Sequence, residues 1–344
     1  METFIGIDYP TWWFLVIGGL FSGYGILDGF DLGAGAWHLF LRKEESRRIA
    51  LNAVGPVWDG NEVWLVIGGG ALFAGFPIVY ASVFSAMYIP FILFLVFLIF
   101  RAVSIEFRSK EPMLWWRKMW DISYSVSSIM LAVLLGVVLG NVLQGMPIGA
   151  DTELEGSWLV FLNPYALMVG VTTLALFMMH GAIYLTMKTE GRLFAKFTLL
   201  LRNAIIFFVV SFAITSIYTL IYFPHLSDRL KEAPALFLIP LAAFLSIANI
   251  PRLASKRKYL PAFLFSCLTL SLMLMVVAIE LYPNIILSTI DPAYSLTVYN
   301  AAASQKSLSI MLVIAAIGAP LVLAYTAFVF WTFRGKVKLD ESSY

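Results

Sequence analysis

The chain has 344 residues, of which 60% are hydrophobic and only 13% are charged. A soluble protein of this length needs a larger charged share to keep its surface solvated, so the composition indicates a polytopic membrane protein. The net charge of +2 does not indicate a nucleic-acid-binding protein, and the single cysteine, Cys267, excludes an intrachain disulfide and a cysteine-ligated metal cluster.

About nine apolar segments are long enough to cross a hydrocarbon core of about 30 Å. The predicted fold class is therefore all-α, with about nine transmembrane helices. The N-terminus is acidic and lacks the basic region of a signal peptide, so the first segment is expected to be retained. The segments lie at about 11–37, 53–75, 78–101, 122–143, 162–187, 203–223, 235–251, 260–282 and 308–333.

The connections between these segments are short, so we expect no soluble catalytic domain and a single transmembrane domain over residues 1–344. Nine spans pack naturally as two four-helix bundles and one peripheral helix. The first bundle is expected at about 11–143, the second at about 162–282 and the extra helix at about 308–333. Only Gly75-Phe76-Pro77 separates the second span from the third, which predicts a tight helical hairpin.

The Lys and Arg residues predict how the chain is oriented in the membrane. All of the 23 basic residues except Arg229, Lys231 and Lys306 fall on alternate connections or in the C-terminal tail. By the positive-inside rule, the N-terminus is expected outside and the C-terminus in the cytoplasm. The alternation also predicts an odd number of spans.

Two carboxylates stand out in the second span. Asp59 and Glu62 lie three residues apart in Gly55-Pro-Val-Trp-Asp-Gly-Asn-Glu-Val-Trp64, and this spacing places both acids on one face of a helix. If the span begins near Ala53, they lie roughly 9 and 14 Å inside the membrane. Carboxylates at such a depth are costly and indicate a functional site.

Further charged residues are expected in the same cytoplasmic half of the membrane. Asp28 and Asp31 belong to the first span, Arg101 ends the third, and Glu106 follows it. Five acids and one arginine from three consecutive spans predict a polar funnel open to the cytoplasm, and protonatable groups in series suit a proton relay. Structural readings stay open, since Asp28 and Asp31 could pair with Arg42 or Arg101, and Arg101 could snorkel to the interface.

Three more residues at depth suggest weaker hypotheses. Trp64 could line a cavity. His180 and Glu280 could contact a haem or a quinone, but a helix–helix hydrogen bond is the favoured interpretation of both. A haem protein needs axial ligands at depth, and His180 is the only deep histidine, so the chain is poorly equipped to hold several haems.

Several motifs together resemble subunit II of the cytochrome bd-type quinol oxidases. The resemblance is dense over about the first half of the chain and continues through Gly181-Ala-Ile-Tyr-Leu185. The other matching stretches are Asp28-Gly-Phe-Asp-Leu-Gly33, Gly55-Pro-Val-Trp-Asp-Gly-Asn-Glu-Val-Trp-Leu65, Gly69-Gly-Ala-Leu-Phe-Ala74, Phe100-Arg101, Glu106-Phe-Arg-Ser-Lys110, Gly140-Asn-Val-Leu-Gln-Gly145 and Asn163-Pro164.

The resemblance implies a subunit of a quinol:oxygen oxidoreductase in a bacterial plasma membrane. Its partner would be a larger subunit I that carries the quinol site, two b-type haems and the d-type haem where dioxygen is reduced to water. This chain would ligate no haem, hold no catalytic residue and stabilise the partner. The complex would be electrogenic without pumping protons. The resemblance is also compatible with a small single-helix subunit and with bound lipid or quinone.

The resemblance also implies roles for individual residues. Asp59 and Arg101 match positions in a proton path from the cytoplasm, and Glu106 matches an acid of that path that some members carry as Asp. Trp64 matches a residue beside a route for dioxygen. Glu62 is Gln in some members of the family, which weakens the case for a required charge there.

Two other classes of protein remain as alternatives. A proton- or cation-coupled secondary transporter has the same composition and buried acids, but its broken helices commonly occur in matching halves. Here the polar residues cluster in the first half alone. A purely structural membrane anchor would not account for five clustered acids.

Overall fold

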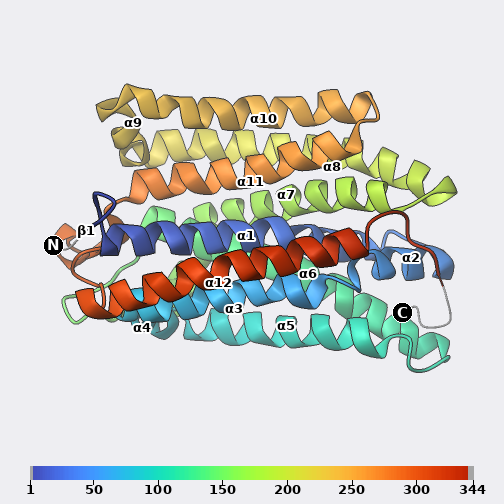
Figure 1. Cartoon of the computed structure of the whole chain (residues 1–344), viewed down its shortest axis with the longest axis horizontal. Helices are drawn as coiled ribbons and strands as arrows, with labels where there is room; N and C mark the ends of the chain where they lie inside the picture. The colour runs from blue at the N-terminus through green and yellow to red at the C-terminus, as the bar shows by residue number, and fades with distance from the viewer. Residues whose placement is uncertain (1–2, 340–344) are drawn as a thin grey trace.

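Long helices that run side by side along the longest axis of the molecule make up the structure (Figure 1). The computed structural model describes residues 3–339, and twelve α-helices lie within them. Helix α1 begins at one end of the molecule and α12 finishes at the other. A chain whose first and last helices begin and finish at opposite ends crosses an odd number of times, as the alternating charges predicted.

The first six helices are α1 (Tyr9–His38), α2 (Glu44–Val54), α3 (Trp58–Gly75), α4 (Pro77–Ala86), α5 (Tyr88–Phe107) and α6 (Leu114–Gln144). The others are α7 (Pro164–Lys188), α8 (Gly191–Tyr222), α9 (Asp228–Glu232), α10 (Leu238–Ser255), α11 (Tyr259–Leu281) and α12 (Gln305–Thr332). Among the described residues, eight of these helices are long and apolar enough to cross a membrane, and the bent pair α3–α4 raises the number to nine. The predicted all-α fold with about nine spans is therefore confirmed.

Short elements connect the helices at the end where α1 begins. Two-residue strands β1 (Thr3–Phe4) and β2 (Ile7–Asp8) form an antiparallel hairpin, in which Thr3 pairs with Asp8. Strands β3 (Asn284–Ile286) and β4 (Leu296–Thr297) form a second antiparallel pair before α12. The 3₁₀ turns are η1 (Trp158–Leu162), η2 (Pro224–Ser227), η3 (Pro234–Phe237) and η4 (Pro292–Tyr294).

The second span does not begin where hydropathy placed it. The predicted helix over 53–75 starts only at Trp58, because residues 44–54 form the separate helix α2. Pro56 has no backbone N–H and cannot continue the hydrogen bonds of α2, so the chain breaks between α2 and α3. Asp59 consequently lies in the first turn of α3, and its predicted depth of roughly 9 Å along that helix was wrong.

The third predicted span is two helices. Helix α3 ends at Gly75, and α4 turns away from it by 119°. The chain therefore turns sharply at Gly75-Phe76-Pro77 as predicted, but α3 and α4 form one bent span and not the predicted hairpin of two spans. Pro77 stands in the first turn of α4, where its missing N–H has no cost. A second interruption at Met87 separates α4 from α5, and α5 alone makes the return crossing.

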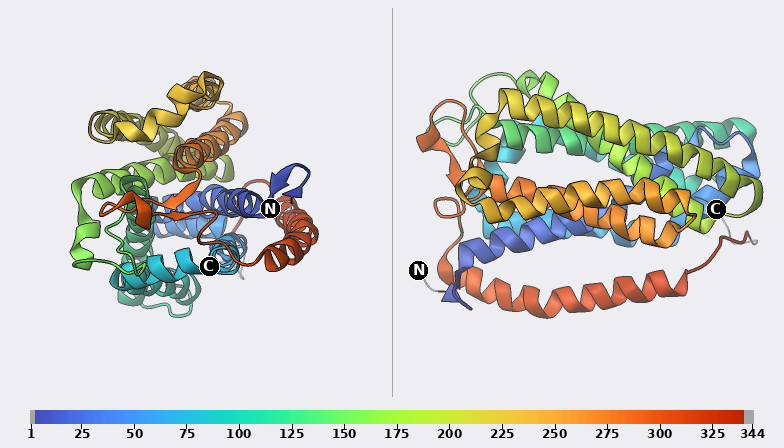
Figure 2. Two further views of the ribbon diagram at one scale, coloured as in Figure 1. Left: turned by 90° about the vertical axis from the view of Figure 1, so that its left-hand side faces the viewer. Right: turned by 90° about the horizontal axis from the view of Figure 1, so that it is seen from above.

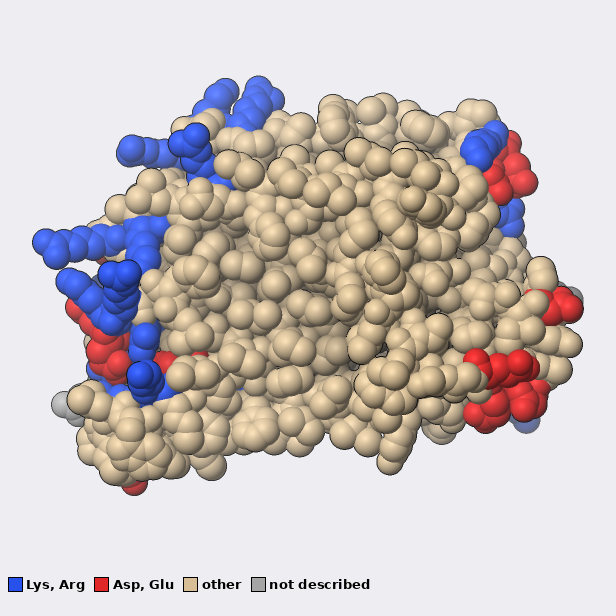
Figure 3. All heavy atoms as spheres, turned by 180° about the vertical axis from the view of Figure 1, so that it is seen from behind, with Lys and Arg blue, Asp and Glu red and all other residues tan. Residues whose placement is uncertain are grey.

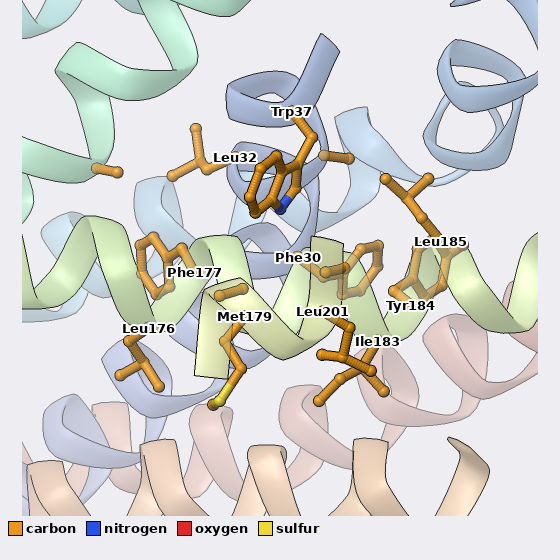
Figure 4. Close-up of a cluster of buried hydrophobic side chains, with 14 of the residues drawn as sticks. Phe30, Leu32, Trp37, Leu176, Phe177, Met179, Ile183, Tyr184, Leu185 and Leu201 are labelled. Carbon is orange, nitrogen blue, oxygen red and sulfur yellow. The ribbon is translucent and has the colours of Figure 1, made fainter. Parts of the chain in front are cut away.

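Helix α1 occupies the centre of the bundle, between α3, α6, α7 and α11. Figure 4 shows Phe30 and Trp37 of α1 beside side chains of α7, with the ring of Phe30 stacked on that of Tyr184 at 4.0 Å. The indole nitrogen of Trp37 donates to the Met178 carbonyl oxygen at 2.8 Å. Because α1 packs against helices of both predicted bundles, the division at 11–143 and 162–282 stays a prediction.

Glycines allow α1 and α7 to approach each other closely. A Cβ atom added to Gly33 would lie 1.9 Å from the carbonyl oxygen of Phe177, and one added to Gly181 would lie 2.6 Å from the backbone nitrogen of Ala34. Both glycines belong to motifs singled out in the sequence. Their role here is close helix contact, as small residues provide in membrane proteins.

Helix α12 lies along the outside of the bundle (Figure 2) and is largely exposed. Its first turn is held by Trp13, whose indole nitrogen donates to the Leu308 carbonyl oxygen at 3.0 Å. Beyond its last turn, the Val337 amide donates to the Lys188 carbonyl oxygen at 2.9 Å. Contacts at the two ends therefore hold the helix that the sequence predicted to be peripheral.

Charges gather at the two ends of the molecule, and the middle of the face drawn in Figure 3 shows neither kind. Most of the visible Lys and Arg side chains lie at one end, which we call the basic end. It is the end where α1 finishes and α3 begins. An uncharged band between charged ends is what a membrane-spanning protein needs.

Substitution of Gly33 by alanine should destabilise the fold. Overpacking typically costs about 1–3 kcal/mol, and the upper end is expected because the added methyl group meets backbone. Thermal unfolding of the detergent-solubilised protein measures the effect. Gly19→Ala is the matched control on the same helix, because a methyl group there meets no atom within 4 Å. Equal unfolding midpoints for the two variants would contradict the tight crossing.

Candidate functional site

An ion pair between α1 and α5 forms the centre of the candidate site. Arg101 and Asp28 are both completely buried. Arg101 donates from Nη1 to Asp28 Oδ2 at 2.8 Å, and from Nη2 to Asp28 Oδ1. A bidentate pair of this kind offsets part of the cost of burying two charges. Arg101 therefore does not snorkel, and it is Arg101, not Arg42, that pairs with Asp28.

Asp31 lies one turn further along α1 and has a different environment. Its Oδ2 atom accepts a hydrogen bond from Asn61 Nδ2 at 2.7 Å, while its buried Oδ1 atom has no protein partner. Asp28 uses both carboxylate oxygens to hold Arg101. Asp31 is thus the acid of α1 that keeps an oxygen available for a proton.

Helix α3 brings the other two acids to the same site. Glu62 Oε2 lies 4.0 Å from Arg101 Nη1. Asp59 is exposed in the first turn of α3, where it lines a pocket of about 120 Å³ together with Asn61 and with Tyr325 and Thr326 of α12. Asn61 therefore connects the pocket to the buried carboxylate, because it lines the first and donates to the second.

The remaining predicted residues lie around this cluster. Glu106 is half-buried in the last turn of α5, about 140° around the helix from Arg101. Trp64 is buried against α1, where a Cβ atom on Gly23 would lie 2.5 Å from its ring. The structure thus groups Asp28, Asp31, Arg101 and Glu62 directly. Asp59 reaches them through Asn61.

The deep histidine makes the helix–helix hydrogen bonds that the sequence favoured. His180 of α7 has Nδ1 at 2.7 Å from Ser266 Oγ of α11 and Nε2 at 2.9 Å from the Ile26 carbonyl oxygen of α1. Its ring stacks on Phe263 at 4.7 Å. Glu280 accepts a hydrogen bond from the backbone of Arg229.

A second buried charge network, which the sequence did not reveal, lies at the basic end. Asp121 of α6 is held by His38 Nε2 at 2.5 Å, by Arg47 Nη1 at 2.7 Å and by Arg108 Nε at 2.6 Å. Arg108 also donates to Glu44 at 2.9 Å. The network joins the end of α1 to α2, to α6 and to the residue that follows α5. One signal was available, because Asp121 is an acid at the start of an apolar segment.

Arg108 stays charged in this network. Burial by itself lowers the pKa of its guanidinium group, but hydrogen bonds to Asp121 and Glu44 outweigh burial and raise the pKa above its ordinary value. Two arginines and a histidine around one carboxylate therefore keep Asp121 ionised. The network is suited to fix the helix ends at the surface.

Comparison with known proteins gives a consistent result. The family model described as cytochrome bd terminal oxidase subunit II matches residues 9–333. Subunit 2 of the cytochrome bd-I ubiquinol oxidase of Escherichia coli K12 is 34% identical, and the match covers 97% of each chain. Subunit 2 of the cytochrome bd ubiquinol oxidase of Bacillus subtilis is also 34% identical, over 96% of this chain and 97% of its own.

Among solved structures, the fold is similar to that of the bd oxidase from Geobacillus thermodenitrificans. The TM-score is 0.79, and the match covers 94% of this chain and 98% of the other at 19% sequence identity. A likeness at this identity concerns the arrangement of the helices. It agrees with the nine-span architecture described above.

Substitution of Asp121 by asparagine should destabilise the protein strongly, since His38, Arg47 and Arg108 would lose the negative charge that they share. Breaking a buried ion pair costs about 3–5 kcal/mol. The control is Asp228→Asn, which removes an exposed pair with Lys231 worth at most about 1 kcal/mol. Thermal unfolding in detergent compares the two, and a similar small loss in both would show that the network does not hold the helix ends.

Proposed function

Because the chain belongs to the cytochrome bd terminal oxidase subunit II family, we propose that it supports a quinol oxidase that reduces dioxygen to water. In this role it stabilises the haem-bearing subunit I, supplies protons and guides dioxygen. The sequence left a secondary transporter open as an alternative. Family membership favours the oxidase subunit over the transporter. The observation that carries the proton role is the Asn61 side chain, which joins the Asp59 pocket to buried Asp31.

The basic end faces the cytoplasm in this proposal. The gathering of Lys and Arg there supports the orientation by the positive-inside rule. The site of Asp28, Asp31 and Arg101 then lies in the cytoplasmic half of the membrane. Protons taken from the cytoplasm have only part of the membrane to cross before they reach it.

Protons enter through the pocket between α3 and α12. Asp59 accepts a proton there, and water beside Asn61 passes it to Asp31, whose Oδ1 atom has no protein partner. Arg101 holds Asp28 as an anion and lies 4.0 Å from Glu62, so its charge stabilises a carboxylate that has released its proton. Glu106, at the end of α5, collects protons at the surface.

The partner subunit covers one face of α3. Asp59, Val63, Val66, Gly70 and Phe73 recur every three or four residues, so they form one exposed stripe. Beyond Asp59 the exposed side chains of this stripe are apolar, so they can pack on a protein partner within the membrane. Subunit I on this face would also receive protons directly from Asp59.

Haem chemistry belongs to subunit I. Both ring nitrogens of His180, the histidine that the sequence placed at depth, are already hydrogen-bonded. This supports the proposal that the chain itself ligates no haem. The two b-type haems, the d-type haem and the quinol site are therefore assigned to the partner, where the haems supply electron transfer and oxygen reduction.

Trp64 is proposed to border the dioxygen route. It lies five residues beyond Asp59 on α3 and packs against Gly23 of α1. Its apolar ring supports passage of a small apolar molecule next to the charged site. The apolar outer faces of the other helices are covered by lipid.

Substitution of Asp59 by asparagine should slow quinol oxidation while leaving the complex assembled, since Asp59 lies at an exposed position in the first turn of α3. We expect the turnover rate to fall roughly tenfold, which is less than the largest contribution that a proton-transferring side chain makes to a rate. Oxygen consumption per haem measures it. Glu232→Gln, an exposed acid at the other end of the molecule, is the control, and wild-type turnover in Asp59→Asn would refute the proton role.

A bulky residue on the exposed stripe of α3 should block assembly. Gly70→Phe fills space where a Cβ atom meets nothing within 4 Å, so the chain itself should fold. Ile217→Phe on the exposed face of α8 is the matched control. Co-purification of subunit I with a tagged chain should fall for Gly70→Phe alone, and equal recovery would place the partner on another face.

A further inference from the structure

One face of α1 carries a row of titratable residues that reaches from the basic end toward the middle of the helix. The row consists of Tyr24, Asp28, Asp31 and His38, with Gly35 between the last two. Successive positions are four, three, four and three residues apart, so they lie above one another on a single face. All five are buried. The row therefore connects the charge network at the surface to the buried site.

The single gap in this row is filled from α6. Gly35 has no side chain, and a Cβ atom there would lie 3.2 Å from Cζ of Tyr124 and 2.0 Å from Oγ of Ser128. The ring of Tyr124 also meets the ring of His38 edge-on, with centroids 5.1 Å apart. A phenol and a hydroxyl thus stand between His38 and Asp31, which are about 10 Å apart along the helix.

The acid and the base at the two ends of this gap each have a polar atom without a hydrogen-bond partner. His38 Nδ1 and Asp31 Oδ1 are buried and have no hydrogen-bond partner in the protein. Buried polar atoms in native proteins are almost always satisfied, and water is the usual partner when the protein supplies none. Both atoms are therefore placed to bind water on either side of Tyr124.

Apolar side chains surround the gap and confine the polar groups to this one line. Leu51, Trp58 and Ile105 pack with Tyr124 in a small buried cluster. On the surface side, Asp121 connects His38 to Arg108 and through it to half-exposed Glu44. The row is thus linked to the surface by hydrogen bonds and ion pairs at one end, and it meets the carboxylate site at the other.

We propose that a second proton inlet runs along α1, through His38 and Tyr124 to Asp31, in parallel with the pocket at Asp59. It rests on the proton-supplying function proposed above. His38 Nε2 donates to Asp121, which keeps the ring fixed. Nδ1 accepts a proton from water that enters beside the ring from the basic end, and then releases it to the next water molecule on the side of Asp31. The proton passes along water and the Tyr124 hydroxyl to Asp31 Oδ1. His38 and Tyr124 are new relay residues in this assignment.

The experiment uses the purified two-subunit complex and compares Tyr124→Phe with Tyr165→Phe. Each variant removes one hydroxyl from a buried tyrosine, and Tyr165 bonds only Thr219, away from α1. Both are made in the wild type and in Asp59→Asn, with oxygen consumption per haem measured in water and in deuterium oxide. Haem content per chain reports assembly, so a folding defect is seen separately.

The α1 inlet predicts that Tyr124→Phe slows the Asp59→Asn complex about fivefold further, with a larger solvent isotope effect. Tyr165→Phe should change neither quantity. His38→Gln, which keeps a hydrogen bond to Asp121 but cannot relay a proton, should act like Tyr124→Phe and lose the pH dependence of the remaining turnover. The groups that face His38 are Asp121 and Tyr124, with Arg47 and Arg108 bound to Asp121.

The outcomes separate this inlet from the function on which it rests. If Asp59→Asn slows turnover and Tyr124→Phe adds nothing, the α1 inlet is refuted and the pocket route stands. If Tyr124→Phe slows turnover and Asp59→Asn does not, the inlet stands and the pocket route falls. If neither substitution changes turnover or isotope effect, both proposals are refuted.

Discussion

The buried ion pair between Asp28 and Arg101 is the interaction on which the site depends. Two opposite charges inside a bilayer are tolerable only when each compensates the other with good hydrogen-bond geometry. The pair therefore constrains how α1 and α5 lie against each other. With Asp28 used in this way, Asp31 and Glu62 remain as the acids whose protonation can change near a fixed positive charge.

Helix α1 can carry this row of polar groups because it lies at the centre of the bundle. Gly33 lets its backbone approach α7 closely, and the aromatic face around Phe30 packs against Tyr184. Apolar side chains pack on one side of α1, and the charged side chains lie on the other. This separation keeps the water near the polar row away from lipid. The same arrangement gives the two proposed proton inlets a common end at Asp31.

Much of the fold and part of the site followed from local sequence. Segment length and hydropathy predicted the nine spans, and the expected position of Asp28, Asp31 and Arg101 in the same half of the membrane predicted a shared polar site. The break at Pro56 was missed, because a hydropathy window averages over a break and does not register where a helix turns. His38 and Asp121 were missed because they lie 83 residues apart, and nothing local links them.

The sequence by itself determined that the chain crosses a membrane about nine times and that costly carboxylates concentrate in its first three spans. These properties depend on the transfer of side chains between water and lipid, which is additive along the chain. Only the tertiary structure decided which acid pairs with Arg101, that Asn61 joins the pocket to Asp31, and that Tyr124 fills the gap at Gly35. Such contacts depend on the relative position of separate helices, because hydrogen bonds and ion pairs act over a few ångströms and require a partner from elsewhere in the chain.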